Sequence, residues 1–292
     1  MYELIQVAPR TYYIDCPAKI GVVKLDEQRV CLIDSGNDKD AGKKVLKVLA
    51  QNGWTLDCVI NTHSHADHVG GNHYLQAQTG CRIYAGGIEA AFTRAPVLEP
   101  VTLYGGFPPQ SLRHKFLMAQ ESDVLELNGE GFPKELEIIP LPGHSFDMIG
   151  IRTPDDVVFL ADCLSSAQTL EKYAVTYLYD VDAYLKTLDA VKNMHAACFV
   201  PSHAEPAADM AALAQLNQEK VQEILALILE MVQAPATFET ILARIFTHYA
   251  LTMTAQQHAL VGSTIRSYLS YLKDQGKIDV QFVENRMEFF AK

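Results

Sequence analysis

Short runs of apolar and β-branched residues alternate with stretches of helical spacing along residues 11–203. "RVCLID" (29–34), "LDCVINT" (56–62) and "DVVFLAD" (156–162) are typical of buried strands, and "DAGKKVLKVLAQNG" (40–53) has the apolar spacing of a helix that ends on a glycine. Strands interleaved with helices favour an α/β layered fold. Because such folds place their chemistry in loops that follow the strands, we expect the functional site in loops of this kind.

The same criteria predict the remaining elements. Strands are expected over residues 11–15, 20–25, 81–85, 136–141, 148–153 and 198–203, and helices over residues 72–80 and 182–195. Residues 93–120 interrupt this pattern with four prolines and two adjacent glycines. Long irregular insertions in compact domains are usually functional or disordered. We expect this segment to be a lid over the site.

The composition changes after His203. Residues 209–233 form a long helical pattern, and two further helical stretches precede the alternating residues 279–291. Helix, helix and hairpin are the order of a winged-helix unit. We therefore predict two domains: residues 1–206, which carry the site, and a small helical, winged-helix-like domain at residues 207–292. Residues 221–232 are too apolar for a solvated face, which predicts packing on the core or in a homodimer.

Charge and cysteine usage limit the partners and the compartment. The formal net charge is −11 without an evident basic patch, which disfavours a nucleic-acid partner. The six cysteines are scattered without a C-x-x-C pair, as in proteins with reduced core thiols. No run approaches the ~18 apolar residues that cross a bilayer, and the first residues lack the pattern of a signal peptide. These features predict a cytoplasmic protein without a membrane partner.

The stretch "NTHSHADHVGGN" (61–72) places three histidines and an aspartate in six consecutive positions. In extended backbone, residues two apart project to the same side, so His63 and His65 can hold one ion together. Asp67 and His68 lie at the turn into the next helix and can face a second point. Four ligands cannot fill two tetrahedral zinc sites, so further ligands are expected elsewhere in the chain.

Three polar residues have the matching placement, each in a loop after a strand: His144 in "LPGHS", Asp162 in "FLADC" and His203 in "VPSHAEP". Together with the H-x-H-x-D-H stretch, and in this order, they resemble the metallo-β-lactamase superfamily of metallohydrolases. The resemblance covers residues 10–206. It implies an αββα sandwich, in which two mixed β-sheets are flanked by helices.

The resemblance also implies which residue binds which metal. One metal is expected on His63, His65 and His144, and the other on Asp67, His68 and His203, with Asp162 bridging both. Asp34, in "LIDSG", matches the buried aspartate that supports the metal loop. Two zinc ions are expected, although iron or manganese would also suit these ligands.

The implied activity is metal-assisted hydrolysis of a small-molecule substrate. Two metals lower the pKa of a shared water, so that a bridging hydroxide exists near neutral pH, and they polarise the bond that is attacked. Asp67 would orient this hydroxide, and Asp34 would act through the metal loop. "THSHADHVGGN" resembles the glyoxalase II branch, which implies an ester, thioester or lactone substrate. Lys172 and Tyr173, where related thioester hydrolases bind the thiol half, and His114 in the expected lid are candidate substrate contacts.

Other functions stay open. Members of the superfamily with a winged-helix-like tail cleave RNA, but residues 207–292 hold seven Lys and Arg against nine Asp and Glu, a net charge of −2. Nucleic-acid modules are usually basic, so an endoribonuclease or phosphodiesterase ranks second. A persulfide dioxygenase with a single iron is the third candidate, and His65 argues against diiron electron carriers, which usually have glutamate there. The intact ligand set disfavours a non-catalytic scaffold.

Overall fold

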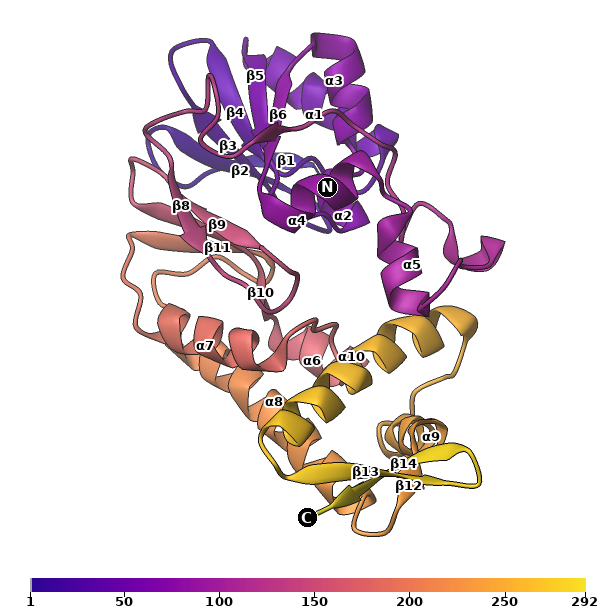
Figure 1. Cartoon of the computed structure of the whole chain (residues 1–292). Coiled ribbons are helices and arrows are strands. Elements are labelled where there is room, and N and C mark those ends of the chain that lie inside the picture. The colour runs from indigo at the N-terminus through magenta and orange to yellow at the C-terminus, as the bar shows by residue number, and fades with distance from the viewer. Residues whose placement is uncertain (1) are drawn as a thin grey trace.

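The computed structural model describes residues 2–292 and contains two β-sheets that lie between outer helices (Figure 1). The first sheet has the strand order β1 (Glu3–Gln6), β2 (Thr11–Asp15), β3 (Ile20–Lys24), β4 (Arg29–Ile33), β5 (Thr55–Ile60), β6 (Arg82–Ala85) and β7 (Leu125–Glu126). Its first four strands pair antiparallel, and β4 to β7 pair parallel.

The second sheet has the order β11-β10-β9-β8 and is also mixed. Its strands are β8 (Glu137–Pro140), β9 (Ile149–Arg152), β10 (Val157–Ser165) and β11 (Cys198–His203). β10 and β11 are parallel, whereas β8, β9 and β10 pair antiparallel. Two mixed sheets between helices confirm the predicted αββα sandwich.

Strand β4 shows why these strands read as continuous apolar runs. Cys31 and Ile33 pack in one buried cluster with Phe159 of the second sheet. Val30 and Leu32 belong to another cluster, on the side of the helices that cover the first sheet. Because side chains alternate along a strand, a strand that is buried on both faces is apolar at every position.

Helices cover the outer face of each sheet. α1 (Lys39–Gln51) and α3 (Asn72–Thr79) lie on the first sheet, and α7 (Val181–Lys192) and α8 (Ala211–Met231) lie on the second (Figure 1). The short helices α2 (Ala66–Val69), α4 (Gly87–Arg94) and α6 (Ala167–Tyr173) follow β5, β6 and β10. Among residues 2–292, none of the helices combines the length and the apolarity needed to span a bilayer.

The C-terminal region has the predicted succession of helices and a hairpin. After α8 come β12 (Ala236–Thr237), α9 (Phe238–His248), α10 (Ala255–Asp274), β13 (Ile278–Val283) and β14 (Arg286–Ala291). One apolar cluster runs from β10 and α7 through α8, α9 and α10 to the hairpin. The apolar face expected at residues 221–232 packs in this cluster through Val221, Ile224 and Ile228. The region therefore shares its core with the second sheet, and a domain boundary at residue 206 stays a prediction.

The segment predicted as a lid, residues 93–120, is partly helical. It contains the end of α4, the helix α5 (Leu98–Tyr104) and a 3-10 turn, η1 (Gln110–Leu112). Leu103 and Leu117 pack with Ala259 of α10 in a small apolar cluster, and α5 meets the N-terminal end of α10 in Figure 1. The segment thus connects the first sheet with the C-terminal region, and its role as a lid stays a prediction.

Candidate metal centre

The loop between β5 and α3 contains α2 and carries four of the predicted ligands. It lies on the loop after β4, where the backbone N–H and the hydroxyl of Ser35 donate to the His68 carbonyl at 2.8 and 3.0 Å. A Cβ at Gly70 or Gly71 would lie 2.3 Å from the backbone of Asn37 or Ser35. The double glycine of "HVGGN" is therefore required for the close approach of the two loops.

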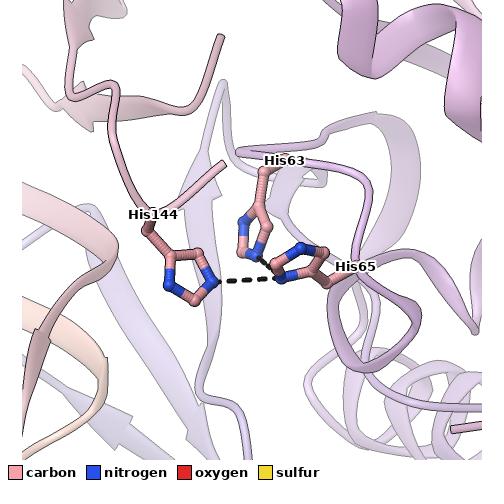
Figure 2. A group of neighbouring side chains, drawn as sticks. All are labelled: His63, His65 and His144. Carbon is pink, nitrogen blue, oxygen red and sulfur yellow. Dashed lines mark hydrogen bonds between the residues drawn. The ribbon is translucent and has the colours of Figure 1, made fainter. Parts of the chain in front are cut away.

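His63, His65 and His144 form the first ligand group. The Nε2 atoms of His63 and His144 lie 3.1 and 3.0 Å from Nδ1 of His65. Figure 2 shows the three rings converging, two from the loop after β5 and one from the loop after β8. Nitrogens that bind one tetrahedral zinc at about 2.0–2.1 Å lie roughly 3.3 Å apart, which is close to the separations found.

In two of the three rings, the nitrogen that faces away from the group is paired with an oxygen atom. Nδ1 of His144 donates to the Tyr177 carbonyl, and Nδ1 of His63 lies 3.1 Å from Oγ1 of Thr62. The Thr62 hydroxyl donates its own proton to Asp34, so it accepts from His63. Both Nε2 lone pairs therefore point at the third ring of the group. One proton on that ring cannot satisfy both lone pairs, whereas a bound cation satisfies all three nitrogens.

Asp67, His68, Asp162 and His203 form the second ligand group. Nε2 of His203 lies 3.3 Å from Asp67 Oδ2 and 3.2 Å from Asp162 Oδ2, and Nε2 of His68 lies 3.1 Å from Asp162 Oδ1. These last two atoms are buried, and within residues 2–292 neither makes an aligned hydrogen bond, despite the 3.1 Å between them. Because buried polar atoms are costly when unsatisfied, this pair of atoms also fits a divalent cation.

Burial sets the protonation of the first group. It lowers the pKa of all three imidazoles, and it brings those of His65 and His144 to about 4. Desolvation disfavours the charged form of a histidine. The three rings are therefore neutral near pH 7 and can bind a metal without releasing a proton.

Carboxylates set the protonation of the second group. Asp162 raises the pKa of His203 to about 10. Burial alone would lower the pKa of His68, but the surrounding carboxylates, Asp162 first, outweigh it and hold this pKa well above its ordinary value. A metal that binds here must displace protons.

Asp34 lies where the resemblance predicts a supporting aspartate. Its carboxylate is buried and accepts hydrogen bonds from the Thr62 backbone N–H, the Thr62 hydroxyl and Nδ1 of His68, each at 2.8 Å. Its backbone is in the left-handed region, with φ at 66°, a conformation that aspartate tolerates better than most residues. Asp34 therefore orients a ring of the second group and also fixes the start of the ligand loop.

A cavity of about 1080 Å³ opens beside the second group, and its walls include the candidate contacts Lys172 and Tyr173. The Lys172 ammonium lies 4.7 Å from the centre of the Tyr173 ring. His114, the third candidate, is not among the described residues that line this cavity. Its Nδ1 accepts a hydrogen bond from the Phe116 backbone N–H at 3.3 Å within the 93–120 segment. The structure thus brings the seven predicted ligands together and places two of the three candidate contacts beside them.

Two residues near the first group were not predicted from the sequence. Glu89 of α4 is a buried carboxylate that accepts hydrogen bonds from both loops of that group. Like the ligands, it follows a strand closely, in "YAGGIEAA", but an acidic residue in a helical pattern is usually solvent-exposed. Tyr177 packs its ring edge-on at 5.2 Å from that of His65, and nothing in the sequence around it indicates this contact.

The comparisons with known proteins match this arrangement. The profile of the metallo-beta-lactamase superfamily matches residues 13–203, which include all seven predicted ligands. A hydroxyacylglutathione hydrolase from Rhodopseudomonas palustris (strain BisB18) is 27% identical over 162 residues, 55% of this chain and 54% of that protein. A protein of the same name from Methylococcus capsulatus is 56% identical over 39 residues, 13% of this chain and 15% of its own length. The chain thus spans about half the length, or less, of these curated relatives.

Solved structures share the fold at low sequence identity. A beta-lactamase domain protein from Burkholderia ambifaria superposes with a TM-score of 0.74 at 15% identity, over 99% of this chain and 94% of its own. A metallo-beta-lactamase family protein from Thermus thermophilus gives 0.69 at 17%, over 99% and 97%. A subclass B3 metallo-beta-lactamase of Bradyrhizobium japonicum gives 0.58 at 19%, over 77% and 94%. The first two likenesses include the C-terminal region, and the profile match covers more than half of the chain. The chain belongs to the metallo-beta-lactamase superfamily.

Proposed function

We propose that this protein is a metallohydrolase that uses two zinc ions on a small ester, thioester or lactone. The observation that carries the proposal is the position of Asp162. Its Oδ1 lies 3.1 Å from His68 Nε2, and its Oδ2 lies 3.2 Å from His203 Nε2 and 3.7 Å from His144 Nε2. One carboxylate therefore lies against both ligand groups, as a bridge between two metals requires.

The contacts of these residues indicate the role of each. His63, His65 and His144 would hold one metal, and Asp67, His68 and His203 the other, with Asp162 between them. Metals bound there lower the pKa of water and polarise the bond under attack. The Asp67 side chain is 44% exposed and lines the large cavity, so its carboxylate can accept a hydrogen bond from a water and orient the oxygen toward a substrate. Asp34 keeps the His68 ring turned so that Nε2 faces Asp162.

The cavities support a substrate with a polar half and a short apolar half. The large cavity offers hydroxyl and ammonium groups beside apolar side chains such as Leu251 and Val261; the polar groups come from Ser165, Ser166, Thr169, Thr252, Thr254, Lys19 and Lys172. A second cavity of about 150 Å³ also contains Asp67, and its apolar wall comes from Leu103, Phe116, Leu117 and Leu260. We infer that a small acyl group enters the second cavity, while a polar or anionic leaving group occupies the first near Lys172.

The names of the relatives favour a thioester among these substrates. Hydroxyacylglutathione hydrolase names an enzyme that removes an acyl group from a thiol compound. The profile match at residues 13–203 contains the predicted ligands, whereas the match to this relative covers only about half of that protein. The thiol half of the substrate is therefore to be identified by experiment on this chain, with hydroxyacylglutathione as one member of the panel.

Two other reactions are weaker candidates. An endoribonuclease or phosphodiesterase ranks second, because the C-terminal region has the element order of a winged helix, but its net charge of −2 and the −11 of the whole chain work against binding RNA. A persulfide dioxygenase with one iron ranks third. It needs one metal site, whereas this chain has two donor groups that could each hold a metal ion.

A substrate panel tests the proposal. The zinc-loaded protein is assayed on thioesters, esters, lactones, phosphodiesters and β-lactams, beside Asp67→Ala, and its metal content is measured after purification without added metal. We expect about two zinc per chain, activity on acyl substrates, and a loss of roughly 100-fold or more in Asp67→Ala, because this variant loses a predicted metal ligand that also orients the attacking oxygen. Full activity of this variant, or cleavage of phosphodiesters alone, would show that the proposed mechanism is wrong.

The expected cytoplasmic location and the homodimer stay predictions. Cell fractionation tests the first. Light scattering of the purified chain tests the second, and a molar mass near 32.4 kDa would indicate a monomer.

A further inference from the structure

Glu89 is a buried carboxylate that belongs to neither ligand group. It lies in the first turn of α4, after β6, and its residue is 1% exposed. A carboxylate this deep in the protein is costly unless several donors satisfy it. The hydrogen-bond donors that contact Glu89 indicate its role.

Each carboxylate oxygen of Glu89 binds a different loop of the first ligand group. Oε2 accepts from the backbone N–H of Ser64 at 2.9 Å and from its hydroxyl at 2.6 Å. Oε1 accepts from the Ser145 hydroxyl at 2.6 Å and from the Asp147 backbone N–H at 3.1 Å. The two shortest contacts have the length of hydroxyl donors to a carboxylate. Asp147 returns a contact to α4, because its Oδ2 accepts from the Ile88 N–H at 2.8 Å.

The two bound serines are direct neighbours of the histidine ligands. Ser64 lies between His63 and His65, and Ser145 follows His144. These loops come from different sheets and are 79 residues apart in the chain at the His65 to His144 contact. We propose that Glu89 is the positioning residue of the first ligand group, which fixes the distance between its two loops so that His63, His65 and His144 bind one metal. The proposal rests on metal binding at this site and does not depend on which bond is hydrolysed.

The geometry makes glutamine the informative replacement. A glutamine side chain has nearly the same shape, but only its oxygen can accept, and its amide nitrogen donates. Whichever way it turns, one serine loop would face an amide donor with its own donors unpaired. Glu89→Gln should therefore loosen one loop relative to the other and leave the second ligand group, which Asp34 supports, in place.

The test is a zinc titration of full-length wild type and Glu89→Gln, with a competing chelator to measure both affinities. Side-chain ¹H–¹⁵N spectra identify which histidines bind at each step. We expect zinc at His63, His65 and His144 to bind about 10–100-fold more weakly in the variant, the usual cost of losing a residue that orients ligands. Zinc binding at His68 and His203 should keep the wild-type affinity. Equal affinity at the first group, or an equal loss at both groups, overturns the proposal.

Two further variants separate positioning from general damage. Thr11→Val removes a buried hydroxyl that binds Thr153 at 3.0 Å. Thr153 follows the C-terminal end of β9. The ligand loop contacts the other end of this strand, where the Ile149 N–H donates to the Thr62 carbonyl. This control should lower stability without changing either zinc affinity, and a selective loss at the first group in Thr11→Val would overturn the proposal.

Ser145→Ala keeps Glu89 and removes one 2.6 Å contact, so it serves even where Glu89→Gln does not fold. We expect a smaller loss that is still confined to the first group, and an unchanged affinity would overturn the proposal. If wild-type protein binds no zinc, the proposed function itself is refuted. If wild type binds two zinc ions and the variants bind them with the same affinities, only the role of Glu89 is refuted.

Discussion

The two ligand groups of the centre differ in charge although they lie side by side. The first consists of three imidazoles, and burial lowers the pKa of His65 and His144 to about 4. The second combines two imidazoles with two carboxylates, and Asp162 raises the pKa of His203 to about 10. The first group is thus ready for a metal at neutral pH, whereas the second holds protons in the place of the metal charge. The two groups would therefore bind a metal under different conditions.

The two groups also differ in how a buried carboxylate supports them. Asp34 binds a ligand of the second group directly, at Nδ1 of His68. Glu89 binds no ligand and holds the first group through the neighbours Ser64 and Ser145. A carboxylate beside a neutral ring would raise its pKa. Glu89 therefore supports the first group without a direct contact to its imidazoles, which burial keeps neutral.

The largest effect is expected where the two groups meet. Asp162→Asn removes the charge that both groups share, and we expect kcat/KM to fall by roughly 1000-fold or more, because several kcal/mol of charge stabilisation depend on both metals. The matched control is Asp182→Asn, an exposed aspartate of α7 that pairs with Lys186. Steady-state kinetics on the best substrate measure both. Should Asp162→Asn keep activity within tenfold of wild type, Asp162 is not the bridge.

Asp34→Asn should weaken zinc binding at the second group and spare the first, the reverse of the effect expected for Glu89→Gln. It replaces the charged partner of His68 and weakens zinc binding at the second group by about 10–100-fold. The first group should keep its affinity, apart from a minor effect through Thr62, which binds both Asp34 and His63. Zinc titration with histidine spectra measures this. The comparison between the groups breaks down if Asp34→Asn weakens the first group as much as the second.

The pH dependence of zinc binding should differ between the groups. The pKa of His203 is raised to about 10 from an ordinary 6.5, so below pH 10 a metal must displace its proton. The pKa of His68 is raised as well, so the apparent affinity of the second group should rise about tenfold per pH unit between pH 7 and 9 for each of the protons that the metal displaces. His65 and His144, with a pKa of about 4, are already neutral in that range, so the first group should change little. Parallel pH profiles for the two steps would contradict the charge difference.

The smallest effect is expected at Thr62, which joins Asp34 to the first group. The Thr62 hydroxyl donates to Asp34 and accepts from His63. Thr62→Val should weaken both metal sites by roughly fivefold, since a lost hydrogen bond is worth about 1 kcal/mol. Competition titration against a chelator resolves a change of this size. A loss at one group only would show that Thr62 serves that group alone.

The predicted ligands could be located from the sequence because each lies within a strand or just after one, although Asp162 lies inside β10 and His203 ends β11, not in the loops after these strands as predicted. His63, His144 and His203 come after β5, β8 and at the end of β11, and apolar runs that end in polar residues can be recognised without a structure. The match of residue types to the superfamily pattern then assigned them to two groups. The positions of the main strands and of the large helices were predictable for the same reason.

Features that depend on tertiary contacts could not be predicted. Glu89 differs from a solvated glutamate only by the loops that approach it. α5 was missed because the four prolines of residues 93–120 suggested irregular structure, although the one proline of α5, Pro100, lies in its first turn, where proline is tolerated. The orientation of His114 depends on how residues 93–120 pack on α10, which no local pattern encodes. β7 and β12 span two residues each and are too short to give a periodic signal.

The most direct test of two adjacent metals is a crystal structure of the zinc-loaded protein with anomalous diffraction at the zinc edge. We expect two peaks per chain, one among His63 Nε2, His65 Nδ1 and His144 Nε2, and one among Asp67, His68 and His203, with Asp162 between them. A single peak at full zinc saturation, or two peaks that do not share Asp162, would contradict the binuclear centre.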